Sequence, residues 1–325
     1  MIAVLGAGAW GTALAQTMAL QEDVMLWARE AEVVEAVNAT HENPLFLPGV
    51  PLSPRIQATA DLGDLKRSDF WLVVPPAQHV RPVLLAAPVG HGPALILCAK
   101  GIEAGTLRLM AEVAAEVAPA SALAVLSGPS FAADVARGLP TAVTLAAGGE
   151  GQAAALADRI ARPAFRPYAT TDITGCEIGG AVKNVLAIAC GVVIGAGLGE
   201  SARAAIVARG FAEMTRFGLA RGARAETLAG LSGLGDLVLT CGSTQSRNMQ
   251  LGMALGQGKS AAEALAGKLS VAEGAVTAPV LIEAAACAGV DMPISQAVAD
   301  LLAGNATVKD IIGRLLARPL KSEGV

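Results

Sequence analysis

The sequence predicts an α/β fold, with a Rossmann-type doubly wound sheet at the N-terminus and an all-α C-terminal domain. Short continuous apolar runs alternate with helical patterns up to about residue 172, as in a parallel sheet covered by helices on both faces. A glycine-rich turn joins the first run to the first helix. Beyond residue 172 the runs stop, and Ala- and Leu-rich segments with helical periodicity follow. We therefore expect one domain over residues 1–176 and a helical domain over residues 177–325.

The composition narrows the classes of function. A chain of 325 residues is long enough for two domains of ~150 residues each. Its net charge of -4 gives no electrostatic reason to expect nucleic acid or an anionic membrane as partner. The five cysteines and three histidines are scattered without metal-ligand spacing, so we expect a reducing compartment and no metal. The apolar N-terminal stretch lacks a basic region, and we expect a cytoplasmic protein without membrane insertion.

The first expected strand, over residues 1–5, runs directly into the glycine pattern GxGxxG. Gly6 permits a tight turn, Gly8 lets a pyrophosphate approach the backbone, and Gly11 allows the helix to pack closely on the strand. The start of the helix then offers unpaired N–H groups to phosphates. The pattern predicts dinucleotide binding, and a purely structural glycine turn is the alternative.

The end of the second expected strand, over residues 24–27, bears on the choice of cofactor. NAD-specific folds usually place Asp or Glu ~20 residues past the glycines, where it binds the ribose 2′-hydroxyl. This chain has Arg29 at that point, followed by Glu30. An arginine suits a 2′-phosphate, so NADPH is the preferred cofactor, while Glu30 leaves NADH open. A solvated surface arginine is the alternative.

Five further apolar runs predict the rest of the sheet, over residues 70–74, 94–98, 123–126, 141–146 and 165–169. Lys100 follows the second of these runs, at the carboxyl edge where such sheets bind ligands. The segment Ser127-Gly128-Pro129-Ser130-Phe131-Ala132 follows the third run at the same edge. We expect the last two runs to lie near the edge of the sheet.

The helical domain opens on Lys183 and Asn184, which precede an apolar run over residues 185–198. We expect this run to form a buried helix. Because burying an ammonium is unfavourable, Lys183 must snorkel, pair with an anion or have a lowered pKa, and a lowered pKa suits a proton donor and acceptor. A helix-capping lysine is the alternative. Since small-molecule sites usually form at domain seams, we expect Lys183 to face Asp236 across a cleft.

Two polar segments of the helical domain are candidates for substrate binding. Asp236 is a single carboxylate among glycines and leucines, and a satisfied turn aspartate is the alternative. Ser246, Arg247 and Asn248 place a hydroxyl, a guanidinium and an amide at an expected helix start, which suits a phosphate. An ordinary N-cap serine beside a solvated arginine is the alternative there.

Six motifs stand in order along the chain: Gly6-Ala-Gly-Ala-Trp-Gly-Thr-Ala-Leu-Ala15, Lys100-Gly-Ile-Glu103, Ser127-Gly-Pro-Ser-Phe-Ala132, Gly179-Gly-Ala-Val-Lys-Asn184, Gly233-Leu-Gly-Asp-Leu-Val-Leu-Thr240 and Gln245-Ser-Arg-Asn248. In this order and spacing, the chain resembles bacterial NAD(P)H-dependent glycerol-3-phosphate dehydrogenases over residues 2–294. The resemblance implies reversible reduction of dihydroxyacetone phosphate to sn-glycerol 3-phosphate, which provides glycerol phosphate for phospholipid synthesis. The sequence leaves open whether the protein forms a homodimer.

The resemblance also implies roles for individual residues. Lys183 is the expected catalytic proton donor and acceptor. The expected substrate contacts are Lys100, Gly128, Ser130, Lys183, Asp236, Ser246, Arg247 and Asn248. The expected cofactor contacts are Gly6, Gly8, Ala9, Trp10, Gly11, Arg29, Phe46, Lys100, Ala132, Arg247, Val271 and Glu273.

Two departures from the family pattern stand out. Glu200 occupies a position where relatives commonly have Asn, which adds a negative charge near the apolar run. Ala275 and Val276 replace the usual aromatic and basic residues, so contacts from that segment are open. Two other functions also stay open: a two-domain 3-hydroxy acid dehydrogenase with a Lys–Asn pair, and a regulatory protein that senses NADPH without turnover.

Overall fold

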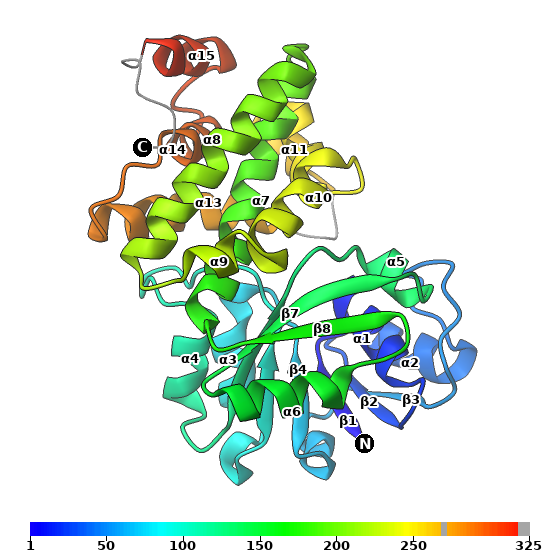
Figure 1. Ribbon diagram of the computed structural model, residues 1–325. Helices are drawn as coiled ribbons and strands as arrows, with labels where there is room; N and C mark the ends of the chain where they lie inside the picture. The colour runs from blue at the N-terminus through cyan, green and yellow to red at the C-terminus, as the bar shows by residue number, and fades with distance from the viewer. Residues whose placement is uncertain (268–271, 318–325) are drawn as a thin grey trace.

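The computed structural model describes residues 1–267 and 272–317, which form a sheet domain and, above it in Figure 1, a helical domain. The chain passes from one to the other in the short turn between strand β8 (Phe165–Thr170) and helix α7 (Ile173–Gly195). The side chain of Asp172 caps α7, because it accepts a hydrogen bond from the Gly175 amide at 2.8 Å. The predicted fold class, a doubly wound α/β sheet followed by helices, is confirmed.

Eight strands form one sheet in the order β3-β2-β1-β4-β5-β6-β7-β8. Neighbouring strands are parallel except β6 and β7, which pair antiparallel. The remaining strands are β1 (Ile2–Leu5), β2 (Val24–Trp27), β3 (Ile56–Thr59), β4 (Phe70–Val73), β5 (Ala94–Leu97), β6 (Leu123–Ser127) and β7 (Thr141–Ala147). The strand order reverses between β1 and β4, so their carboxyl ends flank the crevice where such sheets bind ligands.

Alternate residues of the central strands belong to two different cores. In β1, Ile2 and Val4 lie in one core, and Ala3 and Leu5 lie in the core on the opposite face. Burial on both faces explains why these strands are continuous apolar runs in the sequence. Strand β3 was not predicted, because it lies at the sheet edge and its buried residues only alternate with less buried ones.

Helices cover both faces of this sheet (Figure 1). One core includes residues of α1 (Ala9–Met18), α2 (Ala31–Thr40), α5 (Ala132–Ala136) and α6 (Glu150–Ile160). The other includes residues of α3 (Val80–Ala86) and α4 (Met110–Val117). Three short 3-10 segments complete the domain: η1 (Leu62–Arg67), η2 (Ala77–His79) and η3 (Val89–His91).

The helical domain is built around α7, which packs against α8, α10, α11, α13 and α14. The helices after α7 are α8 (Gly199–Ala220), α9 (Ala225–Leu228), α10 (Asp236–Gly242), α11 (Arg247–Gly256), α12 (Ala261–Leu265), α13 (Glu273–Cys287), α14 (Pro293–Leu302) and α15 (Val308–Leu316), with the π-helical turn η4 (Leu231–Gly235) before α10. The sequence-based expectation of a helical second domain therefore holds for the described residues.

Glycines let α7 and α11 approach each other closely. A Cβ atom at Gly191 or Gly195 of α7 would overlap the backbone of α11, and one at Gly252 or Gly256 of α11 would overlap the backbone of α7.

The helix predicted over residues 185–198 is present, but it is part of a longer helix that begins at Ile173 and ends at Gly195. In the described part of the chain, α7 is the one helix long and apolar enough to cross a membrane, and 89% of its most apolar window is buried. Such burial is typical of the core helix of a globular domain.

Candidate active site

The glycine-rich turn at the carboxyl end of β1 forms an open cradle at the start of α1. Gly6 adopts a φ of 113°, which favours glycine, and a Cβ at Gly11 would overlap the Gly6 carbonyl oxygen. Gly8 is the exposed N-cap residue of α1, and a Cβ at this position would meet no atom within 4 Å. No side chain caps the helix. The backbone N–H groups of this turn are therefore accessible to an anion such as a pyrophosphate.

Four apolar residues that were predicted to contact the cofactor are here called the rim. Ala9, Trp10, Phe46 and Ala132 are all partly buried and pack against the same core. The Trp10 Nε1 atom is buried and has no hydrogen-bond partner, which is rare for a buried donor. A cradle without its own cap and a rim with an unpaired donor fit a nicotinamide dinucleotide.

Arg29 and Glu30 lie at the end of β2, on the side where the ribose of a dinucleotide is expected. The Arg29 guanidinium donates to Glu30 Oε1 from Nε at 3.1 Å and from Nη2 at 2.7 Å. The Arg29 side chain is 77% exposed, so the guanidinium is accessible to a 2′-phosphate. Glu30 is close enough to compete with that phosphate for Arg29.

A buried carboxylate joins two lysines at the junction of the two domains. Lys183 Nζ donates to Asp236 Oδ1 at 2.9 Å, and Lys100 Nζ donates to Asp236 Oδ2 at 2.7 Å. Asp236 is 1% exposed, and the Lys183 and Lys100 side chains are 10% and 13% exposed. Asp236 is thus no ordinary turn aspartate, because both of its oxygens pair with ammonium groups.

The contact between Lys183 and Asp236 was predicted, but its setting differs from the prediction. Both residues belong to the helical domain, Lys183 on α7 and Asp236 at the start of α10, so they do not face each other across the domain seam. Lys100, which follows β5, is the residue that reaches over from the sheet domain. Lys183 also lies well inside α7, and the helix-capping interpretation is therefore wrong.

Two glycines explain how α7 comes so close to this cluster. A Cβ at Gly180 would lie 2.8 Å from Ser127 Oγ and 3.2 Å from Lys100 Cγ. A Cβ at Gly179 would lie 2.5 Å from the Ser232 carbonyl oxygen in η4. The Gly-Gly pair before Lys183 therefore allows the helix to pack directly against the Lys100 side chain and against the turn that carries Asp236.

The charges of the cluster are mutually dependent. Burial lowers the pKa of Lys183 below its ordinary value, and the nearby Lys100 lowers it further, while Asp236 opposes the shift. Although burial alone would raise the pKa of Asp236, the two lysines hold it below its ordinary value. Asp236 is therefore a carboxylate, and Lys183 gives up its proton more readily than an exposed lysine.

Thr240 completes the cluster, and sequence reasoning did not identify it as a site residue. Its hydroxyl accepts a hydrogen bond from Lys183 Nζ at 2.9 Å and donates one to Asp236 Oδ1 at 3.1 Å. Thr240 follows Asp236 by one helical turn on α10. That four-residue spacing within the Gly233–Thr240 motif is the signal that could have identified it.

The β6 loop supplies backbone to the same place. The Gly128 carbonyl oxygen accepts hydrogen bonds from Lys100 Nζ at 3.1 Å and from Ser130 Oγ at 3.0 Å. Gly128 has a φ of 145°, and a Cβ there would lie 2.9 Å from Val143 Cα. A glycine is therefore required where the loop turns to present this carbonyl to Lys100.

The polar segment before α11 has the geometry of a helix start. Ser246 is the N-cap, and its hydroxyl accepts a hydrogen bond from the Met249 amide at 3.2 Å. Arg247 is exposed and makes no ion pair within 4 Å among the described residues. The first turn of α11 contains no acidic residue. A capping role for Ser246 and an anion-binding helix start are both consistent with this arrangement.

Asn248 lies deeper than the sequence suggested. Its Nδ2 donates to Asn184 Oδ1 at 2.9 Å, and its Oδ1 accepts from the Gly274 amide at 3.0 Å. The side chain thus joins α7, α11 and α13. This holds the start of α11 next to the residue that follows Lys183.

Glu273 begins α13 and lies near the cationic groups of the site. Burial raises the pKa of Glu273 above its ordinary value, although the charges of Arg247, Lys100 and Lys183 oppose the shift. Val271, the other predicted cofactor contact in this segment, lies outside the described residues. Ala275 is partly buried and Val276 is 40% exposed.

Glu200 does not bring a free charge to the apolar run. It lies in the first turn of α8, its side chain is 73% exposed, and its carboxylate pairs with Arg203 at 2.6 Å. Arg203 in turn donates to the Cys241 carbonyl oxygen at 3.0 Å. Burial around Lys183 is therefore unaffected by this departure from the family pattern.

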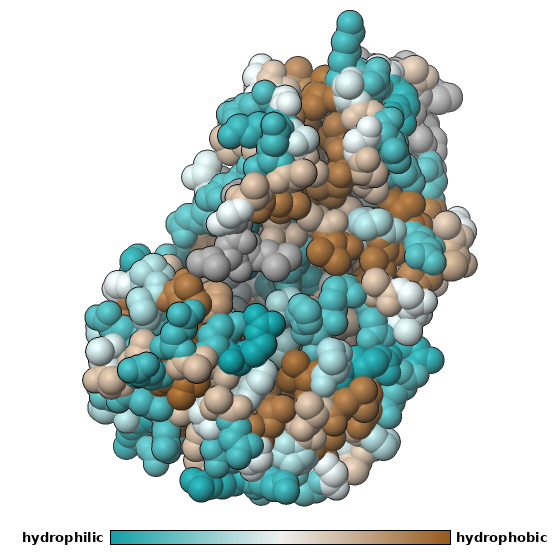
Figure 2. Space-filling view, turned by 180° about the vertical axis from the view of Figure 1, so that it is seen from behind, coloured by the Kyte–Doolittle hydropathy of each residue, from teal (hydrophilic) through white to brown (hydrophobic). Residues whose placement is uncertain are grey.

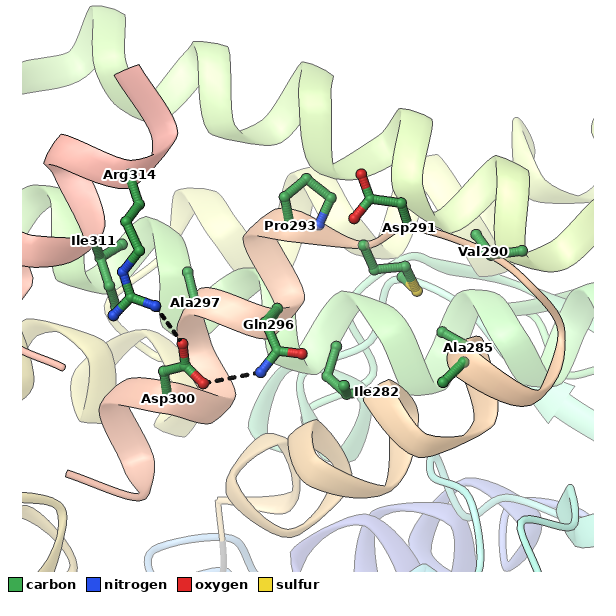
Figure 3. A pocket seen from close by; sticks show the side chains of 12 residues that line it. Ile282, Ala285, Val290, Asp291, Pro293, Gln296, Ala297, Asp300, Ile311 and Arg314 are labelled. Carbon is green, nitrogen blue, oxygen red and sulfur yellow. Dashed lines mark hydrogen bonds and ion pairs between the residues drawn. The ribbon is translucent and has the colours of Figure 1, made fainter. Parts of the chain in front are cut away.

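A separate cavity of about 270 Å³ lies between α13, α14 and α15, where Ile282 and Val290 are among its apolar lining residues (Figure 3). Two of its charged groups pair with each other, because Arg314 donates to Asp300 at 2.8 Å, and the Gln296 amide also donates to Asp300 at 2.9 Å. None of the predicted site residues lines it. Within residues 1–267 and 272–317, no group of His, Cys, Asp or Glu side chains could hold a metal ion.

Comparisons with known proteins identify the family of this chain. The chain matches the model of the NAD-dependent glycerol-3-phosphate dehydrogenase N-terminus over residues 1–153 and that of the C-terminus over residues 172–313. A protein of Erythrobacter litoralis named glycerol-3-phosphate dehydrogenase (NAD(P)+) is 60% identical over 323 residues, which cover 99% of this chain and 97% of that protein. One of the same name from Caulobacter vibrioides is 58% identical and covers 99% of this chain and 98% of its own length.

A solved structure shares the whole architecture. The crystal structure of glycerol-3-phosphate dehydrogenase from Coxiella burnetii matches with a TM-score of 0.92 and 37% identity, and the match covers 98% of both chains. The resemblance found in the motifs therefore extends over nearly the full chain and over both domains. This chain belongs to the NAD-dependent glycerol-3-phosphate dehydrogenase family.

Proposed function

We propose that this protein catalyses the reversible NAD(P)H-dependent reduction of dihydroxyacetone phosphate to sn-glycerol 3-phosphate, with NADPH as the preferred cofactor. The observation that carries the proposal is the buried Asp236 carboxylate, which holds Lys183 and Lys100 together at the domain junction. The names of the relatives and the open dinucleotide cradle support the same reaction.

In this mechanism Lys183 is the proton donor. When bound, the reduced nicotinamide supplies the hydride to the ketone carbon of the substrate. Lys183 Nζ donates a proton to the carbonyl oxygen as it gains negative charge, and the ammonium stabilises that charge before the transfer. The lowered pKa of Lys183 suits this role, since burial already disfavours its charged form. In the reverse direction, neutral Lys183 takes the proton from the substrate hydroxyl.

Asp236 and Thr240 orient the proton donor. With Asp236 Oδ1 and Thr240 Oγ1 as acceptors at 2.9 Å each, two of the three Nζ hydrogens are engaged, and the third is available to substrate. Lys100, bound to the other Asp236 oxygen and to the Gly128 carbonyl, adds positive charge beside the substrate. Gly128 and Ser130 shape the wall on that side.

The start of α11 is the proposed phosphate site. Ser246 and Asn248 fix the first turn of this helix, and its N–H groups favour an anion. Arg247 is exposed and free of carboxylate partners within 4 Å in the described chain, so its guanidinium can bind phosphate oxygens in a bidentate manner. Arg247 also lies near enough to Glu273 for its charge to favour the ionised form of that carboxyl.

The proposed cofactor contacts lie around the glycine turn and the end of β2. The turn of Gly6, Gly8 and Gly11 offers its backbone to the pyrophosphate, and the exposed Arg29 offers its guanidinium to a 2′-phosphate. The further proposed contacts are Ala9, Trp10, Phe46, Lys100, Ala132, Arg247, Val271 and Glu273. A preference for NADPH over NADH follows from Arg29. The neighbouring Glu30 reduces this preference, because it competes with the 2′-phosphate for the Arg29 guanidinium.

A spectrophotometric assay tests the function directly. Loss of NADPH absorbance on addition of dihydroxyacetone phosphate supports it, and the same assay with NADH gives the cofactor preference. Unphosphorylated dihydroxyacetone should react at least ~10³-fold less efficiently in kcat/KM, because it leaves a site built for a phosphate unpaired. Equal rates with both ketones would favour a dehydrogenase of another substrate class. NADPH binding without any substrate-dependent oxidation would favour a sensor protein.

We also propose a cytoplasmic homodimer with a phosphorylated small molecule as its substrate. The predicted boundary between a cofactor domain over residues 1–176 and a substrate domain over residues 177–325 falls inside α7, and we place it instead in the turn before Ile173. Of the large apolar side chains that are exposed, Leu198, Leu219, Val238 and Val276 lie on the helical domain, and burial of any of them against a partner would favour the dimer. Figure 2 shows apolar patches on the back of the molecule. Light scattering after size-exclusion chromatography should give twice the mass of one chain.

A further inference from the structure

Asn43 is a buried amide whose hydrogen bonds connect two segments of the proposed cofactor site. It is 0% exposed and lies in the loop between α2 and β3. Its Nδ2 donates to the Ala7 carbonyl oxygen at 2.9 Å and to Thr12 Oγ1 at 2.8 Å, and its Oδ1 accepts from the Phe46 amide at 3.1 Å. One side chain therefore links the glycine-rich turn to the loop that carries Phe46.

The bond to Ala7 affects the direction of the neighbouring amide. Thr12 Oγ1 also donates to the Ala7 carbonyl, at 3.2 Å, so two donors hold this oxygen on the buried side. In a trans peptide the C=O and N–H groups point in opposite directions. Holding the Ala7 oxygen inward therefore directs the Gly8 N–H outward, to the exposed side where Gly8 faces open space.

The bond to Phe46 acts on the other wall of the cradle. The Leu47 amide also donates to the Asn43 carbonyl oxygen, at 2.9 Å, which closes a compact turn over residues 43–47. Phe46 packs against the same core as Trp10 and Ala132 at the rim. The Asn43 side chain thus fixes where this aromatic ring enters the rim.

We propose that Asn43 is a positioning residue for the nicotinamide cofactor, which directs the Gly8 amide outward and holds Phe46 at the rim of the cradle. The proposal rests on the proposed cofactor roles of Gly8 and Phe46. Asn43 is fully buried and bonds only to the cradle segments, so its effect is on the affinity for the cofactor and not on the proton-transfer cluster around Lys183.

The neighbouring helix offers a control with the same two-sided hydrogen bonding at an exposed position. Asn38 of α2 makes a comparable pair of bonds, because its Nδ2 donates to the Ala58 carbonyl at 2.9 Å and its Oδ1 accepts from the Ala58 amide at 2.8 Å. These bonds join α2 to β3 and do not involve the glycine turn. Asn38→Ala therefore measures the general cost of removing a two-sided asparagine from this part of the fold.

The experiment compares Asn43→Ala, the milder Asn43→Ser and Asn38→Ala in the full chain. We measure the Kd of NADPH by fluorescence titration, kcat and KM for both substrates, and Tm. Asn43→Ala should raise the Kd and KM of NADPH by about tenfold or more. The kcat at saturating NADPH and the KM of dihydroxyacetone phosphate should change by less than about threefold, and Asn43→Ser should fall between Asn43→Ala and the unmodified chain.

Asn38→Ala should lower Tm by less than Asn43→Ala, because Asn38 is exposed and Asn43 is fully buried, and should leave NADPH affinity within about twofold. Unchanged NADPH affinity in Asn43→Ala, or an equal loss in Asn38→Ala, would overturn the positioning role. If the unmodified chain binds NADPH but does not turn over dihydroxyacetone phosphate, the proposed function fails while the binding comparison still decides the role of Asn43. If Asn43→Ala does not fold, Asn43→Ser supplies the same comparison.

Discussion

The two halves of the proposed site are built in different ways. The cofactor cradle consists mainly of backbone, and its three glycines lie within six residues of sequence, from Gly6 to Gly11. The proton-transfer cluster consists of side chains from distant segments, since Lys100 and Asp236 are 136 residues apart and Lys183 and Asp236 are 53 apart. A backbone site is therefore specified locally, whereas a side-chain cluster depends on the packing of α7, α10 and the β5 loop.

This contrast predicts a separation of effects between binding and chemistry. Changes in the cradle should weaken the cofactor complex, and changes in the cluster should slow the reaction within an intact complex. Four substitutions outside the cradle come first, beginning with the largest expected effect, and a substitution within the cradle completes the comparison.

Lys183→Ala should lower kcat by about 10³-fold or more, because it removes both the proton donor and the charge that stabilises the developing alkoxide. Steady-state rates at saturating NADPH and dihydroxyacetone phosphate measure this loss. Lys259, on the connection after α11 and exposed, provides the control, and Lys259→Ala should keep normal turnover. A Lys183→Ala enzyme with near-normal kcat would remove Lys183 from the mechanism.

Arg247→Ala should raise the KM of dihydroxyacetone phosphate by about 10- to 100-fold, because it removes a charge-assisted contact to the phosphate. The matched control is Arg209→Ala, which changes another exposed arginine of the helical domain. If Arg247 is only a solvated surface residue, both variants will have the KM of the unmodified enzyme. Adding inorganic phosphite to an assay with unphosphorylated dihydroxyacetone would then show whether another group of the site binds the phosphate.

Thr240→Val should lower kcat by about 3- to 10-fold, because the isosteric change removes one hydrogen bond to Lys183 and one to Asp236. Thr240→Ser keeps the hydroxyl and should retain most of the activity. The ratio of the two kcat values is the relevant measurement. A serine variant as slow as the valine variant would show that packing of the methyl group, and not the hydroxyl, is what matters.

Glu177 lies on α7 where the two domains meet, and it should affect stability more than activity. Its Oε1 accepts from the Ala111 amide at the start of α4, at 2.8 Å. Burial raises the pKa of this carboxyl from 4.5 to about 8. Between these values the folded protein binds more protons than the unfolded chain, so this group's contribution to the free energy of unfolding falls as pH rises.

Glu177→Gln imitates the protonated acid and should be more stable than the unmodified chain by roughly 2–4 kcal/mol at pH 9, with a difference that vanishes toward pH 4. Urea unfolding at pH 5, 7 and 9 measures this. Glu226→Gln, at an exposed position of α9, serves as the control with little change. The same pH dependence in Glu177→Gln and in the unmodified chain would exclude the buried acid as its source.

Much of the sheet domain could be predicted because its signals are local. The buried runs at β1, β2, β4 and β5 and the GxGxxG turn were found within one or two residues of their ends. The edge strand β3 was missed because exposure of half its residues weakens the apolar signal. The antiparallel pairing of β7 with β6 was also not foreseen, since a short apolar pattern does not contain the direction of the strand.

The cluster could be predicted only in part. The contact of Lys183 with Asp236 was expected, but the position of Lys183 inside a helix that begins at Ile173 was not, because adjacent glycines such as Gly179 and Gly180 are unfavourable inside a helix. Thr240 and Asn43 were overlooked, since a threonine and an asparagine acquire their roles only through contacts formed in the fold. Such roles depend on tertiary packing, which one sequence does not reveal.

The most direct test of this division is a titration of NADPH onto two variants of opposite kind, Lys183→Ala and Gly8→Val. A side chain at position 8 meets no other atom of the protein within 4 Å at its Cβ, so Gly8→Val should fold, yet its isopropyl group should obstruct the pyrophosphate. Fluorescence titration should give a Kd for Lys183→Ala within about threefold of the unmodified value and a Kd for Gly8→Val at least about tenfold higher. A Lys183→Ala variant that loses NADPH as severely as Gly8→Val would contradict the assignment of chemistry to the lysine cluster and binding to the glycine cradle.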